Sequence, residues 1–474
     1  MRRILLAVLA GMCFAGFLAV SAVQGQEVRP HILYILADDL GWKDMGFQGS
    51  PDIKTPNLDR LAGDGVQLDQ FYVQPFCTPS RAALMTGRYP FRYGLQTIVI
   101  PSQGTYGLST EERTLPEILK AAGYRTEMIG KWHLGHADRK YWPRQRGFDY
   151  HYGAVLGEID YFTREAHHVL DWQRNNEEVK EEGYNTQLIG ADAVRRIGQH
   201  DPQTPLFMYL AFTAAHTPYQ ALPEYLEKFG HIEEETRRTY AAMIACFDDE
   251  LGKVLDALEA RGMRQNTLII FHSDNGGTRD AAMTGESKVK VVPCDNGTLR
   301  AGKGSLYEGG VRVPAIVNWP GRLQPAKIGE LIHVVDMLPT IAGVASATTE
   351  GTKPLDGINV WPAIAEGKPS GRTEIIHNVD PFGGAVRQGE WKLVWKAVLP
   401  ARLELFNIAA DPDEKHNVAE ANPQVVARLR ARIEEMVAQS EKPLFMSAAM
   451  DAVFKGIFGP APIPTDEPGA STEP

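Results

Sequence analysis

The sequence predicts an α/β protein with a large, mostly parallel β-sheet and a smaller C-terminal α+β domain that contains an antiparallel sheet. Two observations indicate this fold class. Between residue 28 and about residue 345, short apolar runs alternate with helical segments, which is typical of a parallel sheet with helices on both faces. After about residue 365, strand-like segments follow one another with only turns between them, and one helical segment comes last.

Four apolar runs are the candidate parallel strands, because each is continuous rather than alternating, as expected for strands buried on both faces. They are HILYILADD (31–39), YRTEMIGKWH (124–133), PLFMYLAFTAAH (205–216) and TLIIFHSDN (267–275). Helices are expected between them at residues 55–65, 114–123 and 233–261. The second helix has a capping-box pair, Thr114 with Glu117, and the third carries one apolar stripe.

The two ends of the chain differ in composition from the rest. Residues 1–26 place Arg2 and Arg3 before an apolar run and small residues, which indicates a secretory signal peptide rather than the alternative, a single membrane anchor. We therefore expect an exported protein, periplasmic or extracellular, with no stable membrane anchor. The other predicted units are a main domain over 27–365, a small domain over 366–445 and a disordered, proline-rich tail over 456–474.

Charge and cysteine content limit the partners and the chemistry. The formal net charge of -10 argues against a nucleic-acid partner. Export implies an oxidising compartment, and Cys77, Cys246 and Cys294 remain once the signal peptide is removed. An odd count leaves at least one thiol over, whereas pairing of Cys246 with Cys294 and the oligomeric state both stay open.

Reactive side chains follow each of the four apolar runs. Parallel strands end at one edge of a sheet, so we expect these side chains to converge on one crevice. The alternatives are ordinary, since aspartates often cap helices, single histidines are often structural and loop lysines are often solvated. Their joint occurrence favours a functional site. The residues are Asp38 and Asp39, Lys131 and His133, His216, and Asp274 and Asn275.

Asp38, Asp39, Asp274 and Asn275 offer only oxygen ligands. Such a set suits a hard divalent cation, Ca²⁺ or Mg²⁺, rather than zinc. Three carboxylates in one crevice would repel one another without a cation between them. The alternative is that Asp38 or Asp39 faces solvent and no metal binds.

Cys77 precedes a predicted short helix, with Thr78 as the N-cap, Pro79 as the first helical residue and Gly87 as the stop. We therefore expect Cys77 just outside a helix N-terminus, where anionic ligands are favoured, with Arg81 close enough to reach back. The alternatives at this point are a buried free cysteine, a half-disulfide and a thiol nucleophile.

The longer string decides among these alternatives. Cys77-Thr78-Pro79-Ser80-Arg81, followed by Thr86-Gly87-Arg88, resembles the Cys-x-Pro-Ser-Arg…Thr-Gly motif of the type I sulfatases, which have an alkaline-phosphatase-like sandwich fold. Further segments match that family over roughly residues 30 to 440, and their context is closest to the arylsulfatase B, or N-acetylgalactosamine-4-sulfatase, branch. These segments are ILADDLGWKDMGF, GKWHLG, AAHTPY, FHSDNGG and GKGSLYEGGVRVP, the last with Lys303.

The resemblance implies a mechanism. The cysteine of the motif becomes formylglycine, an aldehyde made by the formylglycine-generating enzyme, and the aldehyde hydrate carries two hydroxyl groups. One hydroxyl attacks the sulfur of a sulfate monoester, and deprotonation of the other expels sulfate and restores the aldehyde. A plain alcohol completes only the first half.

The resemblance also implies a role for each site residue. Asp38, Asp39, Asp274 and Asn275, together with the modified Cys77, hold the cation. Arg81 and His133 hold the hydrate, with His133 as the base for sulfate release. Lys131 and Lys303 neutralise charge on the sulfuryl oxygens, and His216, alone or with Lys303, protonates the departing alcohol.

The implied substrate is a sulfated carbohydrate such as N-acetylgalactosamine 4-sulfate, or an aryl sulfate. One alternative is a phosphoester or phosphonate hydrolase on the same scaffold. Another, of a different class, is a non-catalytic protein that binds sulfated glycans with Cys77 unmodified. Residues 93–104 and 157–168 are candidates for the mouth of the pocket.

Overall fold

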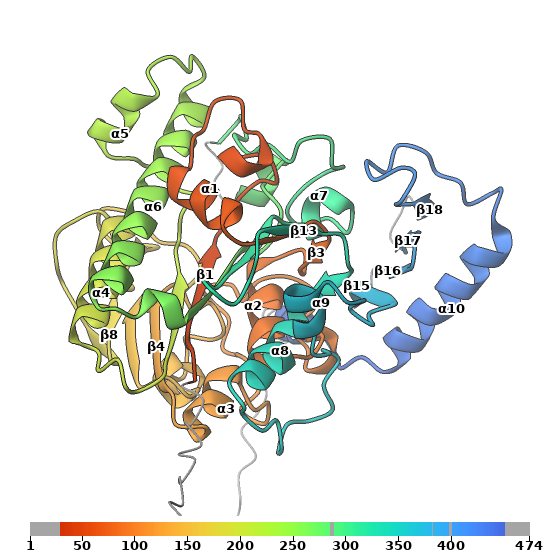
Figure 1. Ribbon diagram of the computed structural model, residues 1–474. Helices are drawn as coiled ribbons and strands as arrows, with labels where there is room; N and C mark the ends of the chain where they lie inside the picture. The colour runs from red at the N-terminus through yellow and green to blue at the C-terminus, as the bar shows by residue number, and fades with distance from the viewer. Residues whose placement is uncertain (1–28, 285–288, 382, 398–400, 451–474) are drawn as a thin grey trace, which may run out of the picture.

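A ten-stranded sheet forms the centre of the protein in the computed structural model, which describes residues 29–284, 289–381, 383–397 and 401–450 (Figure 1). Its central strands run parallel in the order β11-β1-β10-β4-β5. They span Thr267–Ser273, His31–Ala37, Leu206–Ala211, Arg125–Gly130 and Tyr150–Gly153. The strands beyond β11 are β12 (Ala315–Asn318), β2 (Val66–Leu68) and β13 (Ala326–Ile328), and those beyond β5 are β8 (Gln173–Arg174) and β9 (Glu177–Glu178).

Helices cover both faces of this sheet, so its central strands are buried on both sides (Figure 1). Alternate residues of β1 enter two separate cores, with Leu33 and Ile35 in one and Tyr34 and Leu36 in the other. One core is closed by α1 (Pro56–Gly63), α4 (Asn185–Gln199), α5 (Pro223–Lys228) and α6 (Glu235–Ala260). The other is closed by α2 (Cys77–Thr86), α3 (Leu115–Ala121), α8 (Met337–Val344) and α9 (Trp361–Glu366).

A second, antiparallel sheet lies to one side of the main sheet (Figure 1). Helix α10 (Pro423–Ala438) packs against it, as the amphipathic pattern of that segment requires. Its strands are β15 (Glu374–Asp380), β16 (Gly383–Gln388), β17 (Trp391–Lys396) and β18 (Arg402–Asn407). The predicted fold class is therefore confirmed, whereas the exact domain boundary at residue 365 stays a prediction.

Helix boundaries agree with the sequence except at one functionally important point. The capping box of α3 is present, and α1 and α6 lie within the predicted segments. Helix α2, however, begins at Cys77 with Phe76 as its N-cap, so the prediction that Thr78 is the N-cap is wrong. The Thr78 hydroxyl instead donates to the His133 carbonyl at 3.0 Å and accepts from the Ile100 N–H at 3.1 Å. These long-range contacts fix the loop around Cys77.

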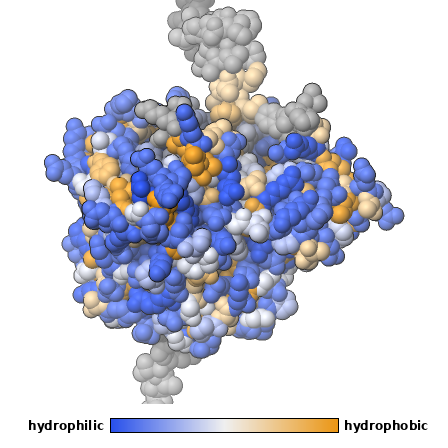
Figure 2. All heavy atoms as spheres, turned by 90° about the horizontal axis from the view of Figure 1, so that it is seen from above, coloured by the Kyte–Doolittle hydropathy of each residue, from blue (hydrophilic) through white to orange (hydrophobic). Residues whose placement is uncertain are grey.

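The structure also bears on membrane spans, cysteine pairing and the character of the surface. None of the helices that the structure describes combines the length and the apolar character needed for a membrane span. All the described cysteines are buried free thiols, so Cys246 and Cys294 are not paired. The face shown in Figure 2 is mostly hydrophilic, with hydrophobic side chains in small groups. The predicted signal peptide (1–26) and tail (456–474) lie outside the described residues.

Candidate active site

The predicted site residues meet at the carboxyl ends of four neighbouring strands. Because β11, β1, β10 and β4 are adjacent and parallel, the loops that follow them share one edge of the sheet. Lys131 Nζ lies 2.5 Å from Asp38 Oδ2, and Lys303 Nζ lies 2.8 Å from Asp39 Oδ2. Lys303, which is distant in sequence, thus reaches the same crevice.

Three buried carboxylates lie in the crevice, and each pairs with a positively charged side chain: Asp274 with Arg81, Asp38 with Lys131 and Asp39 with Lys303. Asp274 Oδ2 accepts hydrogen bonds from Arg81 Nε at 3.0 Å and Nη2 at 2.9 Å. Burial and the negative charge of Asp38 raise the pKa of Asp274 despite this partner. For Asp39, burial acts in the same direction, but Lys303 and His216 outweigh it and hold the pKa of Asp39 below its usual value.

The carboxylates and Asn275 fit a hard divalent cation. Asn275 Nδ2 donates to Asp39 Oδ1 at 2.7 Å, whereas Asn275 Oδ1 is buried with no hydrogen-bond partner in the described part of the chain. A buried acceptor without a partner is costly, and a cation beside it would satisfy it. Asp38 and Asp39 contribute the charge that such an ion prefers.

One potential ligand was not predicted. Ligand atoms of Asp38, Asp39, Cys77 and His216 all lie within 4.8 Å of one another. His216 was expected only as an acid, and sequence reasoning had no signal for it as a possible ligand. Asp274 lies outside this group, although the Asp39 N–H donates to its Oδ1 at 3.3 Å.

Cys77 lies at the first turn of α2, with no exposure to solvent. Its thiol donates to Asp38 Oδ1 at 3.5 Å. Burial, with the charge of Asp274 as the next cause, raises the pKa of the Cys77 thiol well above its usual value. A protonated, buried thiol is a poor nucleophile, so the structure does not favour the alternative of a thiolate nucleophile.

His133 is held in an unusual backbone conformation beside Cys77. Its φ is 61°, in the left-handed region, and its Nε2 lies 3.2 Å from the Ile100 carbonyl oxygen. The other ring nitrogen, Nδ1, is buried without a hydrogen-bond partner among the described residues. Burial and the charge of Lys131 lower the pKa of His133, which leaves the ring neutral, and with Nε2 donating to the Ile100 carbonyl the Nδ1 atom is a hydrogen-bond acceptor.

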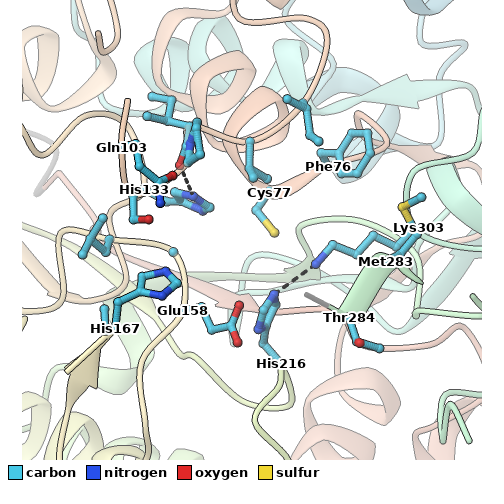
Figure 3. A pocket seen from close by; sticks show the side chains of 18 of the residues that line it. Phe76, Cys77, Gln103, His133, Glu158, His167, His216, Met283, Thr284 and Lys303 are labelled. Carbon is cyan, nitrogen blue, oxygen red and sulfur yellow. Dashed lines mark hydrogen bonds between the residues drawn. The ribbon is translucent and has the colours of Figure 1, made fainter. Parts of the chain in front are cut away.

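A cavity of about 370 Å³ opens over these groups. In Figure 3 the Cys77 thiol points into it, and Lys303 meets His216 on the opposite wall. Both segments predicted for the mouth line it, through Ile98–Gln103 and through Gly157, Glu158 and His167, as Figure 3 shows for Gln103, Glu158 and His167. The lining residues Phe76 and Met283 were not predicted, because their placement depends on how distant loops fold together.

Comparison with known proteins identifies the family. The sequence profile of the sulfatase family matches residues 30–347, and that of the C-terminal region of N-sulphoglucosamine sulphohydrolase matches residues 301–439. The chain belongs to the sulfatase family. It is therefore a sulfuric ester hydrolase, as the motif around Cys77 predicted.

Individual relatives of this sulfatase support the same family. Arylsulfatase J of Mus musculus is 34% identical, over 86% of this chain and 75% of its own length. N-acetylgalactosamine-6-sulfatase of Homo sapiens is 33% identical, over 76% and 70%. The crystal structure of Ps i-CgsB in complex with k-i-k-neocarrahexaose superposes with a TM-score of 0.79 at 35% identity, covering 88% of this chain and 94% of that one. Assignment of this sulfatase to the 4-sulfatase branch stays a prediction.

Proposed function

We propose that this sulfatase removes sulfate from a carbohydrate, using formylglycine derived from Cys77 and a divalent cation, Ca²⁺ or Mg²⁺. The observation that carries the proposal is the arrangement around residue 77. Arg81, Lys131 and Lys303 supply positive charge beside it, and each is fixed by a buried carboxylate. Cations held in place before the substrate arrives stabilise charge on sulfuryl oxygens without reorganisation.

The chain's own residues divide the remaining tasks. Asp38, Asp39, Asp274 and Asn275 would hold the cation, which supplies Lewis-acid stabilisation of a sulfate oxygen. Formylglycine formed from Cys77 would supply the nucleophilic hydroxyl as its hydrate. His133 lies beside residue 77, and its Nδ1 has no hydrogen-bond partner among the described residues, so we assign to it the proton that sulfate release requires.

His216 and Lys303 lie across the cavity from His133 and are suited to protonate the departing alcohol (Figure 3). Their separation of 3.0 Å allows one proton to be shared between them. The proposed acid and the proposed base therefore face each other across the cavity.

Names of the relatives support a carbohydrate substrate. One relative is named N-acetylgalactosamine-6-sulfatase, and one similar solved structure, Ps i-CgsB, is a complex with k-i-k-neocarrahexaose. N-acetylgalactosamine 4-sulfate remains our first candidate, with the 6-sulfate and other sulfated sugars next. An exported location and maturation by the formylglycine-generating enzyme are part of the same proposal.

Desulfation profiling tests the proposal. The protein is produced with the maturation enzyme, and conversion of Cys77 is measured by mass spectrometry of the peptide that contains it. Defined sulfated mono- and oligosaccharides are then supplied, with 4-nitrophenyl sulfate and 4-nitrophenyl phosphate as a matched pair. We expect release of sulfate from a sugar and a strong preference for the sulfate of the matched pair. Preference for the phosphate would favour a phosphoesterase. An unmodified Cys77 thiol in protein from the native host, together with no turnover, would favour a binding protein.

A further inference from the structure

The segment that carries Lys303 forms a closed loop between the two sheets. The Gly309 N–H donates to the Arg300 carbonyl at 2.9 Å, so residues 300–309 return on themselves. On the side of the active site, the Lys303 N–H donates to the Gly277 carbonyl at 3.2 Å and the Gly304 N–H to the Pro75 carbonyl at 2.8 Å. We name residues 300–309 the Lys303 loop.

Arg300, at the first end of the Lys303 loop, contacts the C-terminal sheet. Arg300 Nη2 lies 3.1 Å from Glu404 Oε1, and Nη1 donates to the Glu414 carbonyl at 3.1 Å. The same guanidinium lies 3.9 Å from the centre of the Tyr307 ring, which is cation–π distance. Glu404 also accepts a hydrogen bond from the Tyr307 hydroxyl, so one carboxylate of β18 fixes both ends of the loop.

A fully buried ammonium group secures the second end. Lys392 Nζ on β17 lies 2.8 Å from Glu308 Oε1 and 2.9 Å from Glu414 Oε1. The Glu308 N–H donates to Glu414 Oε2 at 2.6 Å, and the Tyr72 hydroxyl donates to Glu308 Oε2 at 2.7 Å. Glu308 lies at the end of the Lys303 loop and begins α7 (Glu308–Val311).

Burial of the Lys392–Glu308 ion pair beside Glu414 is an expensive way to join two sheets, because apolar contacts of the same volume are often equally stable. Apolar contacts are already present, since Tyr307 packs with Ala385, Val394 and Phe406. The ionic contacts add what apolar packing does not supply, a defined distance and direction for the main chain of the loop. The charged network therefore indicates a requirement for precise placement.

We propose that the C-terminal sheet positions Lys303 for catalysis, with Glu404 and Lys392 as positioning residues that act through the Lys303 loop. The inference rests on the proposed function of Lys303 at the sulfuryl group. Lys303 Nζ meets Asp39 and His216 at 2.8 and 3.0 Å, and errors of about 1 Å in such placement can reduce a rate by on the order of 100-fold.

Glu404→Gln tests this proposal, because it removes the charge that holds Arg300 but keeps an oxygen for Tyr307. Glu374→Gln is the matched control in the same sheet. Glu374 pairs with Arg432 at 2.9 Å with side chains 23% and 30% exposed, against 15% and 31% for Glu404 and Arg300. The control loses a similar ion pair that does not reach the loop.

We expect Glu404→Gln to lower kcat by about 3- to 10-fold with KM nearly unchanged, while Glu374→Gln leaves both unchanged. Hydrogen–deuterium exchange over residues 300–309 is expected to speed up only in Glu404→Gln. In a Lys303→Ala background, Glu404→Gln is expected to cause no further loss of kcat/KM, because its effect requires the ammonium group.

Additive losses in the double variant, or unchanged exchange over the loop in Glu404→Gln, would overturn the positioning role. Failure of the proposed function gives a different result. A protein that cleaves only phosphate esters overturns the sulfate assignment, and the same cycle is then measured on the phosphate. If the protein shows no turnover, hydrogen–deuterium exchange over residues 300–309 in Glu404→Gln and Glu374→Gln still tests whether Glu404 holds the Lys303 loop.

Discussion

Nζ of Lys303 lies 3.0 Å from Nε2 of His216, and the two groups face the cavity together (Figure 3). Burial and the positive charge of Lys303 lower the pKa of His216 to about 3. The neutral His216 therefore accepts a hydrogen bond from the Lys303 ammonium group through Nε2, and the proton stays on Lys303. In the proposed mechanism the pair would therefore act as one proton-donating unit for the departing alcohol, with Lys303 as the immediate source.

The first prediction concerns this unit. Replacement of His216 by Asn removes the hydrogen-bond partner that orients the Lys303 ammonium group. It should reduce kcat by about 10²- to 10⁴-fold for a sugar sulfate, whose alkoxide leaves poorly without a proton. The loss should be much smaller for 4-nitrophenyl sulfate, because nitrophenolate leaves without protonation. Steady-state kinetics on both substrates measure the difference. Equal losses on the two substrates would assign His216 to substrate binding or to the metal instead.

The second prediction concerns residue 77. Cys77→Ser places one hydroxyl group where the hydrate has two, so sulfuryl transfer can occur but sulfate release cannot follow. We expect a single turnover and a stable sulfate ester on Ser, seen as one added sulfuryl group in the intact mass. Cys77→Ala is the control and should gain no mass. Sustained turnover by the serine variant would contradict the two-hydroxyl mechanism.

The third prediction concerns the cation. Exhaustive dialysis against EDTA should lower activity by about 100-fold or more and lower the melting temperature, because the ion would no longer offset the repulsion of Asp274 by Asp38 and Asp39. EGTA with excess Mg²⁺ separates the two candidate ions, since only a calcium site is emptied. Activity and melting temperature that both survive EDTA would remove the metal from the proposal.

The fourth prediction concerns stability and pH. Asp248 on α6 accepts the N–H groups of Asn57 and Leu58 at 3.0 and 2.9 Å, which caps α1 in place of the Thr55 side chain. Burial raises the pKa of Asp248 to about 6. Between pH 4 and 6 the folded state therefore binds more protons than the unfolded state. The contribution of Asp248 to the unfolding free energy therefore falls as the pH rises.

Asp248→Asn removes this titration. Over pH 4 to 6 the unfolding free energy of the variant should fall less steeply than that of the wild type, by on the order of 2 kcal/mol across the interval. Urea unfolding at several pH values measures the two slopes. Parallel curves for wild type and variant would show that Asp248 titrates at its ordinary value in the folded protein.

The sequence predicts the sheet and most of the site because both depend on local patterns. Continuous apolar runs identify β1, β4, β10 and β11, and chemistry-bearing residues follow directly where those strands end. The features that the sequence does not predict depend on contacts between distant segments. The Thr78 side chain forms hydrogen bonds with His133 and Ile100 instead of capping α2, and no local sequence pattern predicts those partners.

The same reason explains the other unpredicted features. Phe76 and Met283 reach the cavity only because loops from different strands fold over one edge of the sheet. The contacts of Glu404 and Lys392 with the Lys303 loop join residues about 100 positions apart. A motif identifies Lys303 as a site residue, but only the packed structure shows what holds it.

The last prediction concerns Gly157, which makes room for His133. A Cβ atom at residue 157 would lie 2.1 Å from His133 Cε1 and 2.3 Å from Nε2, closer than real contacts allow. The His133 ring is confined, because its Nε2 already faces the Ile100 carbonyl and its backbone has a left-handed φ. Gly157→Ala therefore displaces the ring from residue 77 rather than only tightening the packing.

We expect Gly157→Ala to lower kcat by about 10- to 100-fold, through slower sulfate release, while the initial sulfuryl transfer is less affected. Rapid-quench kinetics with 4-nitrophenyl sulfate should then show a burst of nitrophenol followed by a slow steady state. Gly49→Ala serves as a surface control with open space around its Cβ, although its φ of 81° adds local strain. A variant that loses the burst and the steady-state rate equally would place His133 in the attack step instead of the release step.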